Sequence, residues 1–339
     1  MLPDAQMPLI ARLALAAGCL ALSGCYYVHL AAGQLDMNRR REPIAALVAG
    51  KHTDETLRRR LDYASRARDF AISDLGLPDN GSYRSYADLG RPYATWNLFA
   101  APEFSIKPRR WCFPIAGCVV YRGYFKEPDA ARAARRMADG GYDVYVGPSL
   151  AYSTLGHLRD PVLNTMLRYG DAELAALIFH ELAHQAAYIP GDSDFNEAFA
   201  TVVENEGARR WLTHLGRDDE LAAFLAMGRR EQQLAEWMVA TRGRLATLYK
   251  SGAPADEMRS AKTAELTRLR ESMSALGVKS IGDLNNARLA AVATYYRCVP
   301  ALTALLEQHN GNLPDYYAAI RALAHDTAAR SVLCPTDGR

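Results

Sequence analysis

The spacing of hydrophobic and polar positions divides the chain into a mixed first part and a helical second part. Helical and alternating segments follow one another in residues 26–160. From residue 161 to residue 339, apolar side chains recur almost throughout at the spacing of a helix face. We therefore expect a predominantly helical α+β protein, with a small β-sheet in the first part and long helices in the second.

In the mixed part, changes of period mark the expected helices and strands. Asp36–Ser73 is rich in Arg, Leu and Ala and is interrupted at Gly50, which indicates two helices. Aromatic and β-branched residues between Pro and Gly then indicate a small sheet of about three strands. These strands are expected at Tyr93–Phe104, Trp111–Phe125 and Tyr142–Thr154, with a short helix at Glu127–Asp139.

The second part contains long polar helices. Asp218–Lys250 has Leu and Ala at helical spacing between charged residues, and Asp256–Ala275 resembles one arm of a coiled coil. Further helices are expected at Asn285–His309 and Leu313–Ala324.

Composition changes this picture little. The chain is 49% hydrophobic and 23% charged, which is ordinary for a folded protein. Its 40 basic and 38 acidic residues are interspersed and leave a net charge of +2. Such a balance gives no electrostatic footprint for nucleic acid, so we expect no nucleic-acid partner.

The N-terminus carries the pattern of a secretion signal. Leu13–Leu22 is apolar and follows Arg12, and ten residues are too few to span a bilayer. The order Leu-Ser-Gly-Cys at residues 22–25 resembles the lipobox of bacterial lipoproteins, in which cleavage precedes an acylated cysteine. The resemblance implies a signal peptide at residues 1–24, a mature chain at residues 25–339 and a lipid anchor on Cys25. Tyr26 after the cysteine favours the periplasmic face of the outer membrane. The alternative to a signal peptide in this segment is a buried N-terminal helix.

Export changes how the remaining cysteines are interpreted. With Cys25 lipidated, an even number is left in an oxidising compartment: Cys112, Cys118, Cys298 and Cys334. Three pairings are possible, and we favour the local one, which joins the first two and the last two. Metal binding by these four is disfavoured because no two of them form a CxxC pair.

An HExxH motif, His180-Glu181-Leu182-Ala183-His184, is the main chemical signal. Residues four apart share one face of a helix, so both imidazoles can bind one ion, typically Zn²⁺. Glu181 is displaced by about 100° from His180 and can deprotonate a water. Capping residues at Gly170-Asp171 and a stop at Pro190-Gly191 support a helix. The alternative is a surface helix that carries two histidines by accident.

A catalytic zinc site needs a third protein ligand, and Glu197 is the candidate. The stretch Phe195–Ala200 (FNEAFA) resembles the Asn-Glu-x-x-Ala stretch of gluzincin metallopeptidases, where the Glu binds the metal. The other interpretation is a capping box formed by Asp194 and Glu197. Glu204 lies seven residues further on the same face; it could orient a ligand histidine, replace Glu197 as ligand, or be exposed.

Residues around the motif could contact substrate. Leu150–Gly156 ends the last expected strand, and in gluzincins an edge strand beside the metal pairs with the substrate backbone. Tyr152, Ser153 and Thr154 are therefore substrate candidates. A hydrogen-bond donor to the developing oxyanion is also needed, and the candidates are Tyr152, Tyr188, Tyr295 and Tyr296.

Several segments together resemble a bacterial family of predicted aminopeptidases. They are the HExxH motif, FNEAFA, YSTLG, WCFPIAGCVVYRGYF and NARLA with TYYRCVP. The resemblance implies a zincin-like active-site helix beside the small sheet, a Zn²⁺ cofactor and a peptide substrate. A second hypothesis is a non-catalytic envelope lipoprotein that binds a partner through the long polar helices between Asp218 and Ala275, with a structural metal or none.

Overall fold

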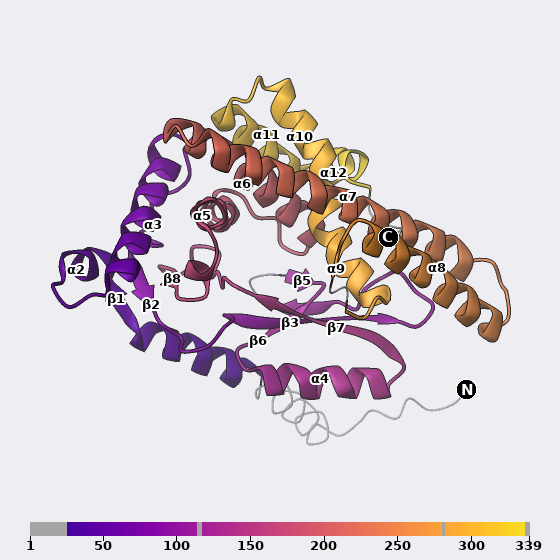
Figure 1. The fold of residues 1–339 in the computed structure, drawn as a ribbon. Coiled ribbons are helices and arrows are strands. Elements are labelled where there is room, and N and C mark those ends of the chain that lie inside the picture. The colour runs from indigo at the N-terminus through magenta and orange to yellow at the C-terminus, as the bar shows by residue number, and fades with distance from the viewer. Residues whose placement is uncertain (1–25, 114–116, 280–281, 336–339) are drawn as a thin grey trace, which may run out of the picture.

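The computed structural model describes residues 26–113, 117–279 and 282–335 (Figure 1). It is a predominantly helical α+β fold with small sheets, which confirms the predicted fold class. The signal peptide predicted for residues 1–24 and the lipidation site Cys25 lie outside the described residues.

A three-stranded antiparallel sheet forms the floor of the molecule. Its order is β6-β3-β7, with β3 (Thr95–Pro102) in the centre between β6 (Arg122–Tyr124) and β7 (Tyr142–Ser149). Strands β3 and β7 pair along their whole length, from Thr95 with Ser149 to Pro102 with Tyr142. Helix α4 (Glu127–Asp139) covers one face of the sheet, and the helices of the second part lie on the other side (Figure 1).

Two of the predicted strands needed correction. The segment predicted as one strand at Trp111–Phe125 is divided into β4 (Trp111–Phe113), β5 (Gly117–Val119) and β6. The backbone turns at Gly117, whose φ of +71° requires glycine, and β4 and β5 pair as a hairpin. Strand β7 ends at Ser149 instead of Thr154, because the residues that follow turn to bond a buried aspartate, Asp160.

A second small sheet joins the beginning of the chain to the middle. Strand β2 (Ser85–Ala87) pairs antiparallel with β1 (Arg41–Pro43) and parallel with β8 (Val162–Leu163). The N-terminal helices are residues 26–39, α2 (Ile44–Ala49) and α3 (Glu55–Ser73). The interruption predicted at Gly50 separates α2 from α3.

The second part is a sequence of helices, beginning with the short 3₁₀ turn η1. Helices α5 and α6 pack beside the sheet, and α7 and α8 form a long antiparallel arm held by residues such as Leu245 and Leu269 (Figure 1). The elements are η1 (Met166–Arg168), α5 (Asp171–Ala186), α6 (Ser193–His214), α7 (Asp218–Tyr249), α8 (Ala255–Ala275), α9 (Asn286–Tyr296), α10 (Val299–Gln308), α11 (Leu313–His325) and α12 (Thr327–Leu333).

The segment predicted as one helix at Asn285–His309 is two helices, α9 and α10, which meet at Arg297 and Cys298. By length and composition alone residues 286–308 could cross a membrane, but 44% of their apolar window is buried inside the fold. Helix α9 packs against β3, α6 and α7. We interpret the pair as core helices of this fold.

The main hydrophobic core draws on both parts of the chain. Phe70 and Leu75 from the first part meet Phe179 of α5 and Trp211 of α6. Helices α5 and α6 come especially close at Gly207, where a Cβ atom would lie only 2.7 Å from the ring of Phe179. The relative placement of these two helices is therefore fixed by tight packing, and the candidate site lies between them.

Candidate metal centre

Helix α5 presents two histidines on one buried face. His180 and His184 are one turn apart, and their Nε2 atoms face each other at 3.2 Å. The helix forms here because acidic residues occupy its first turn and its apolar positions, including Leu174, Ile178 and Leu182, are fully buried. Burial of this face brings the two imidazoles into the interior, where a polar group needs a partner.

The corner between α5 and α6 brings Glu197 to these histidines. Its Oε2 atom lies 3.4 Å from Nε2 of His180 and 3.6 Å from Nε2 of His184. The corner is held by Asn196, whose side chain accepts from the backbone N–H of Ile189 and donates to its carbonyl oxygen, both at 2.8 Å. Buried Asn196 thus fixes the turn that brings its neighbour Glu197 close to the two histidines.

The capping-box interpretation of Asp194 and Glu197 does not describe this corner. Helix α6 begins at Ser193, its N-cap is Asp192, and no side chain caps it. The carboxylate of Asp194 instead pairs with Arg297.

The three donor atoms have the spacing of a metal site. Ligands held about 2.1 Å from an ion at tetrahedral angles lie about 3.4 Å from one another. The observed separations of 3.2, 3.4 and 3.6 Å match that edge length. Two imidazoles and one carboxylate are also the donors that Zn²⁺ accepts in catalytic sites. No other group of three such ligands converges in the described part of the chain.

Glu204 contacts one histidine of this group and does not itself converge with the three donor atoms. Its Oε2 atom lies 2.9 Å from Nδ1 of His180. A hydrogen bond donated by Nδ1–H to this carboxylate leaves the lone pair of Nε2 directed at the centre. Of the roles considered from the sequence, the geometry fits the orienting one. Nδ1 of His184 is buried and has no comparable partner among the described residues.

The electrostatics of the centre favour a cation. Burial alone would lower the pKa of His180, but the carboxylates of Glu197 and Glu204 outweigh it and hold that pKa well above its usual range. Burial would raise the pKa of Glu197, but the two imidazoles lower it to about 2, so this carboxylate stays ionised. The centre therefore attracts a positive charge, which a metal ion can supply in place of the imidazolium proton.

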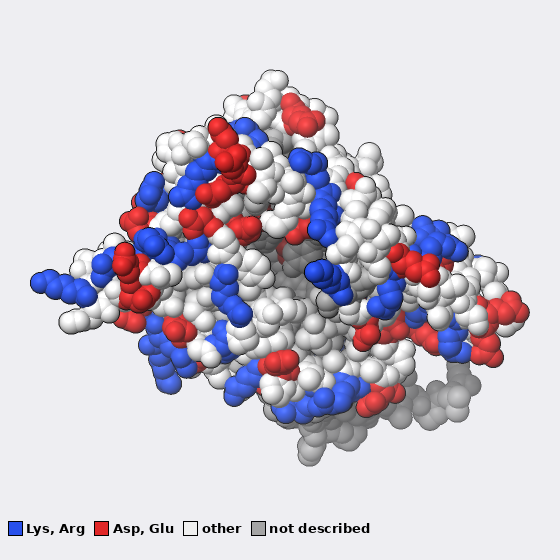
Figure 2. All heavy atoms as spheres, viewed as in Figure 1, with Lys and Arg blue, Asp and Glu red and all other residues white. Residues whose placement is uncertain are grey.

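Glu181 faces the open space beside the centre. Burial raises its pKa above the usual carboxyl value, although the nearby imidazoles partly oppose this. It lines two cavities, of about 720 and 1040 Å³, which both also reach His180. The surface is hollowed between the long helices and the sheet on the face shown in Figure 2. A substrate can thus reach the centre from solvent.

The tyrosines differ in what they face. Tyr295 lines both cavities, and its phenol, whose pKa burial raises, interacts with Glu197 and Glu181. Tyr296 lines the second cavity and bonds Glu231. The remaining candidates line the first cavity: Tyr152, whose ring packs 4.8 Å from that of Phe125, and Tyr188, whose ring lies 6.5 Å from that of His184.

Sequence reasoning missed two residues of this site. Tyr121, in the turn before β6, lines the first cavity and interacts with Glu197 and Glu181 as Tyr295 does. Asp160 is fully buried and accepts hydrogen bonds from the backbone N–H and the hydroxyl of Thr154, with Ser153 at 3.4 Å. The hydroxyls of these two substrate candidates therefore face Asp160, while their segment lines the cavity. Neither missed residue has a local signal in a chain with 18 tyrosines and many acids.

The structure pairs Cys112 with Cys118 and Cys298 with Cys334. This is the local pairing that the sequence favours. The first disulfide closes the β4–β5 hairpin, and the second joins the start of α10 to the residue after α12.

Fold and site together define an α+β protein in which two packed helices present a buried His-His-Glu group beside a further glutamate. Residues 25–332 match the family described as "Putative aminopeptidase", and the chain belongs to that family. Membership points to a peptidase that acts on peptides. No curated protein and no solved structure matches the chain.

Proposed function

We propose that the protein is a zinc-dependent peptidase, and specifically an aminopeptidase. The observation that carries the proposal is the tetrahedral spacing of His180, His184 and Glu197 beside Glu181 at the meeting point of two cavities. The family supports peptide hydrolysis and supports the aminopeptidase specificity by its description. The donor set supports zinc.

His180, His184 and Glu197 would hold the ion, and Glu204 would keep the ring of His180 in its orientation. When bound, zinc supplies a Lewis acid that polarises the scissile carbonyl and lowers the pKa of water. Glu181 takes the proton of the attacking water and passes it to the leaving amine. Its raised pKa suits this task, because a general base and acid works best when its pKa approaches the ambient pH.

Substrate would lie along the end of β7. This strand is at the edge of its sheet, and Ser149 and Ala151 at its end line both cavities. An extended peptide can add to such an edge through backbone hydrogen bonds. The first cavity is lined largely by apolar and aromatic side chains such as Phe113, Val119 and Phe125, which suits an apolar residue of the substrate. Tyr295 would donate a hydrogen bond to the developing oxyanion, a role supported by its position in the lining of both cavities.

The protein would act in the bacterial cell envelope. The lipobox resemblance at residues 22–25 supports cleavage before Cys25 and a lipid anchor, and Tyr26 supports the periplasmic face of the outer membrane. The two disulfides suit an oxidising compartment of this kind.

The decisive test is Glu181→Gln, which keeps the size of the side chain and removes the base. We expect about one zinc per chain in both proteins and a fall in kcat of about 10²- to 10⁴-fold in the variant. Metal content is measured by elemental analysis and hydrolysis with a peptide library. Full activity of the variant would remove Glu181 from the mechanism. Zinc-loaded wild type that cleaves no peptide would favour the partner-binding hypothesis.

A further inference from the structure

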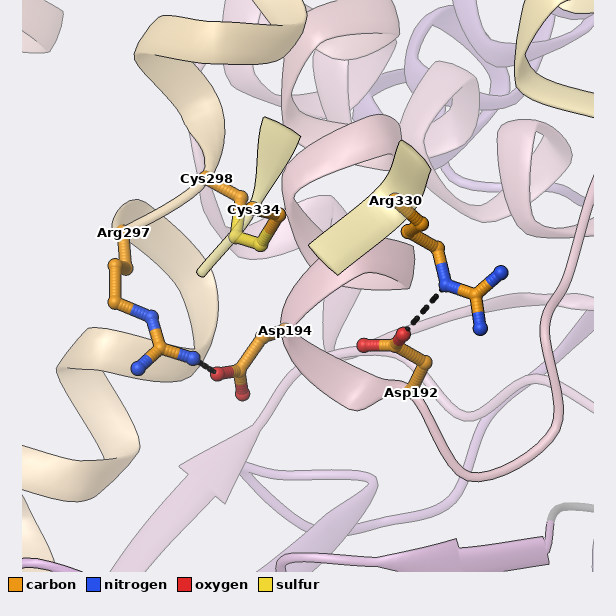
Figure 3. Close-up of a disulfide and its surroundings, with 6 residues drawn as sticks. All are labelled: Asp192, Asp194, Arg297, Cys298, Arg330 and Cys334. Carbon is orange, nitrogen blue, oxygen red and sulfur yellow. Dashed lines mark hydrogen bonds and ion pairs between the residues drawn. A yellow bond between two sulfur atoms is a disulfide. The ribbon is translucent and has the colours of Figure 1, made fainter. Parts of the chain in front are cut away.

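The start of α6, which leads into Glu197, is held by two arginines from the C-terminal region. Arg330 of α12 donates through Nε to Oδ2 of Asp192 at 2.8 Å, and Arg297 pairs with Asp194 (Figure 3). Asp192 is the N-cap of α6 and Asp194 is its second residue, so both bonds lie within about one and a half turns of Glu197. Arg330 is itself buried and also donates to the carbonyl oxygen of Leu323, which fixes it between helices.

One disulfide connects these two arginines. Cys298 follows Arg297 directly, and Cys334 lies four residues, or about one helical turn, after Arg330. Both cysteines are buried, at 2% and 3% exposure. We call Arg297, Arg330 and this disulfide the C-terminal clamp. Without the disulfide, α12, a helix of seven residues, would have no covalent link to α10, and only packing and the bonds of Arg330 itself would keep this arginine on Asp192.

The same corner also rests against the β4–β5 hairpin. Arg110 donates to the carbonyl oxygen of Gly191 at 2.6 Å and to that of Cys118 at 2.7 Å. Hairpin and corner are in close contact, because a Cβ atom on Gly117 would lie 2.7 Å from the backbone nitrogen of Gly191. The α5–α6 corner is therefore contacted by two disulfide-linked segments.

We propose that the C-terminal clamp positions Glu197 for metal binding, and that an intact Cys298–Cys334 disulfide is needed for full metal affinity. The inference rests on the metal site proposed above. Packing at Gly207 fixes how α5 and α6 lie against each other, and the corner between them sets where the first residues of α6, and with them Glu197, lie. A carboxylate displaced by about 1 Å no longer completes a tetrahedral site. Arg297 and Arg330 also neutralise two carboxylates that would otherwise repel that of Glu197.

The consequence is a site completed by oxidation. A dithiol reductant would convert the disulfide to two thiols and would itself become a disulfide, and α12 would then be released from α10. The reduced chain would bind metal more weakly, so that a chain still in a reducing compartment would need more zinc to become active.

The test is the zinc dissociation constant of the full chain, measured by competition with a chelating dye. One variant is Cys298→Ser with Cys334→Ser, and the other is Arg297→Gln, which keeps both disulfides. The control is Arg321→Gln, which removes an exposed arginine from the neighbouring α11. We expect affinity to fall about 10- to 100-fold in the two clamp variants, as for other groups that orient ligands, and to stay unchanged in the control.

Two further readouts separate positioning from general loosening. Far-UV circular dichroism of the metal-free variants should match that of wild type, and kcat should return to near the wild-type value at saturating zinc because Glu181 is intact. Wild-type affinity in the cysteine variant would overturn the role of the disulfide, and wild-type affinity in Arg297→Gln would overturn that of the arginine. If the cysteine variant does not fold, the folded wild-type chain reduced with a phosphine takes its place. A wild-type chain that binds no zinc would instead refute the proposed function.

Discussion

Substitutions of Glu204 test whether its hydrogen bond to His180 orients this histidine in the proposed metal centre. Its carboxylate accepts from Nδ1–H of His180 at 2.9 Å and is not one of the three converging ligands. Removing it in Glu204→Ala should leave all three ligands in place but free the ring of His180 to rotate and to change tautomer. Glu204→Gln keeps an acceptor oxygen and removes only the charge.

The expected magnitude follows from the contact. Groups that orient a ligand histidine typically contribute 10- to 100-fold in metal affinity, or about 1.4–2.7 kcal/mol. The side chain of Glu204 is 29% exposed, so water can partly replace it and the lower half of this range applies. We expect about a 10- to 30-fold weaker zinc affinity for Glu204→Ala. A neutral acceptor is about half as strong as a charged one, so Glu204→Gln should lose only about 3- to 10-fold.

The assay is a competitive zinc titration of the three proteins. The control is Glu206→Gln, because Glu206 lies on the same helix and pairs with Arg209 and Arg210 away from the histidines. It changes the charge of α6 equally and should leave the zinc affinity unchanged. An unchanged affinity in Glu204→Ala would refute the argument that this hydrogen bond fixes His180.

Three further outcomes are expected. Gly207→Ala should lower the free energy of unfolding by about 1–3 kcal/mol in denaturant titrations, because its Cβ would collide with Phe179. The control Gly243→Ala, in an open stretch of α7, should raise it by up to about 1 kcal/mol; the same sign for both would contradict the packing argument. Tyr295→Phe should lower kcat about 100-fold with little change in KM, and an unaltered kcat would exclude it as oxyanion donor. Removing zinc should cost about 2.7 kcal/mol of stability relative to protein at 100 times the dissociation constant, which calorimetry with and without chelator would measure.

Elements with strong local signals could be predicted from the sequence, and their bounds agree closely. The helix predicted at Glu127–Asp139 is α4, because a proline in its first turn and a glycine pair at its end define both limits. The long helix predicted at Asp218–Lys250 is α7, one residue shorter. By contrast, β1, β2 and β8 have two or three residues each, and such short strands show no alternation to detect.

Two limits differ from the prediction for different reasons. The break between α9 and α10 has a local signal that the predicted single helix did not use, because Pro300 lies in the first turn of α10 and a helix does not continue unbroken through proline. Strand β7 ends before Thr154 because the backbone N–H and the hydroxyl of Thr154 donate to Asp160. In a longer strand this N–H would be available to pair with a neighbouring strand instead. For β7 the local pattern was compatible with a longer strand, and a long-range contact shortened it.

The candidate site divides in the same way. The pair of histidines in α5 follows from helical periodicity, because residues four apart share a face in any helix. Glu197 has no such guarantee, since a carboxylate at that place suits a helix cap as well as a metal. Contacts outside the HExxH motif favour the ligand role. The side chain of Asn196 bonds the backbone of Ile189 and so fixes the turn before Glu197. Arg297 pairs with the carboxylate of Asp194, which a capping box would need as its N-cap acceptor. The distance of Glu197 from the two histidines therefore depends on the α5–α6 corner and on the residues that contact it. Substitutions in those contacts should alter metal affinity even when the HExxH sequence is unchanged.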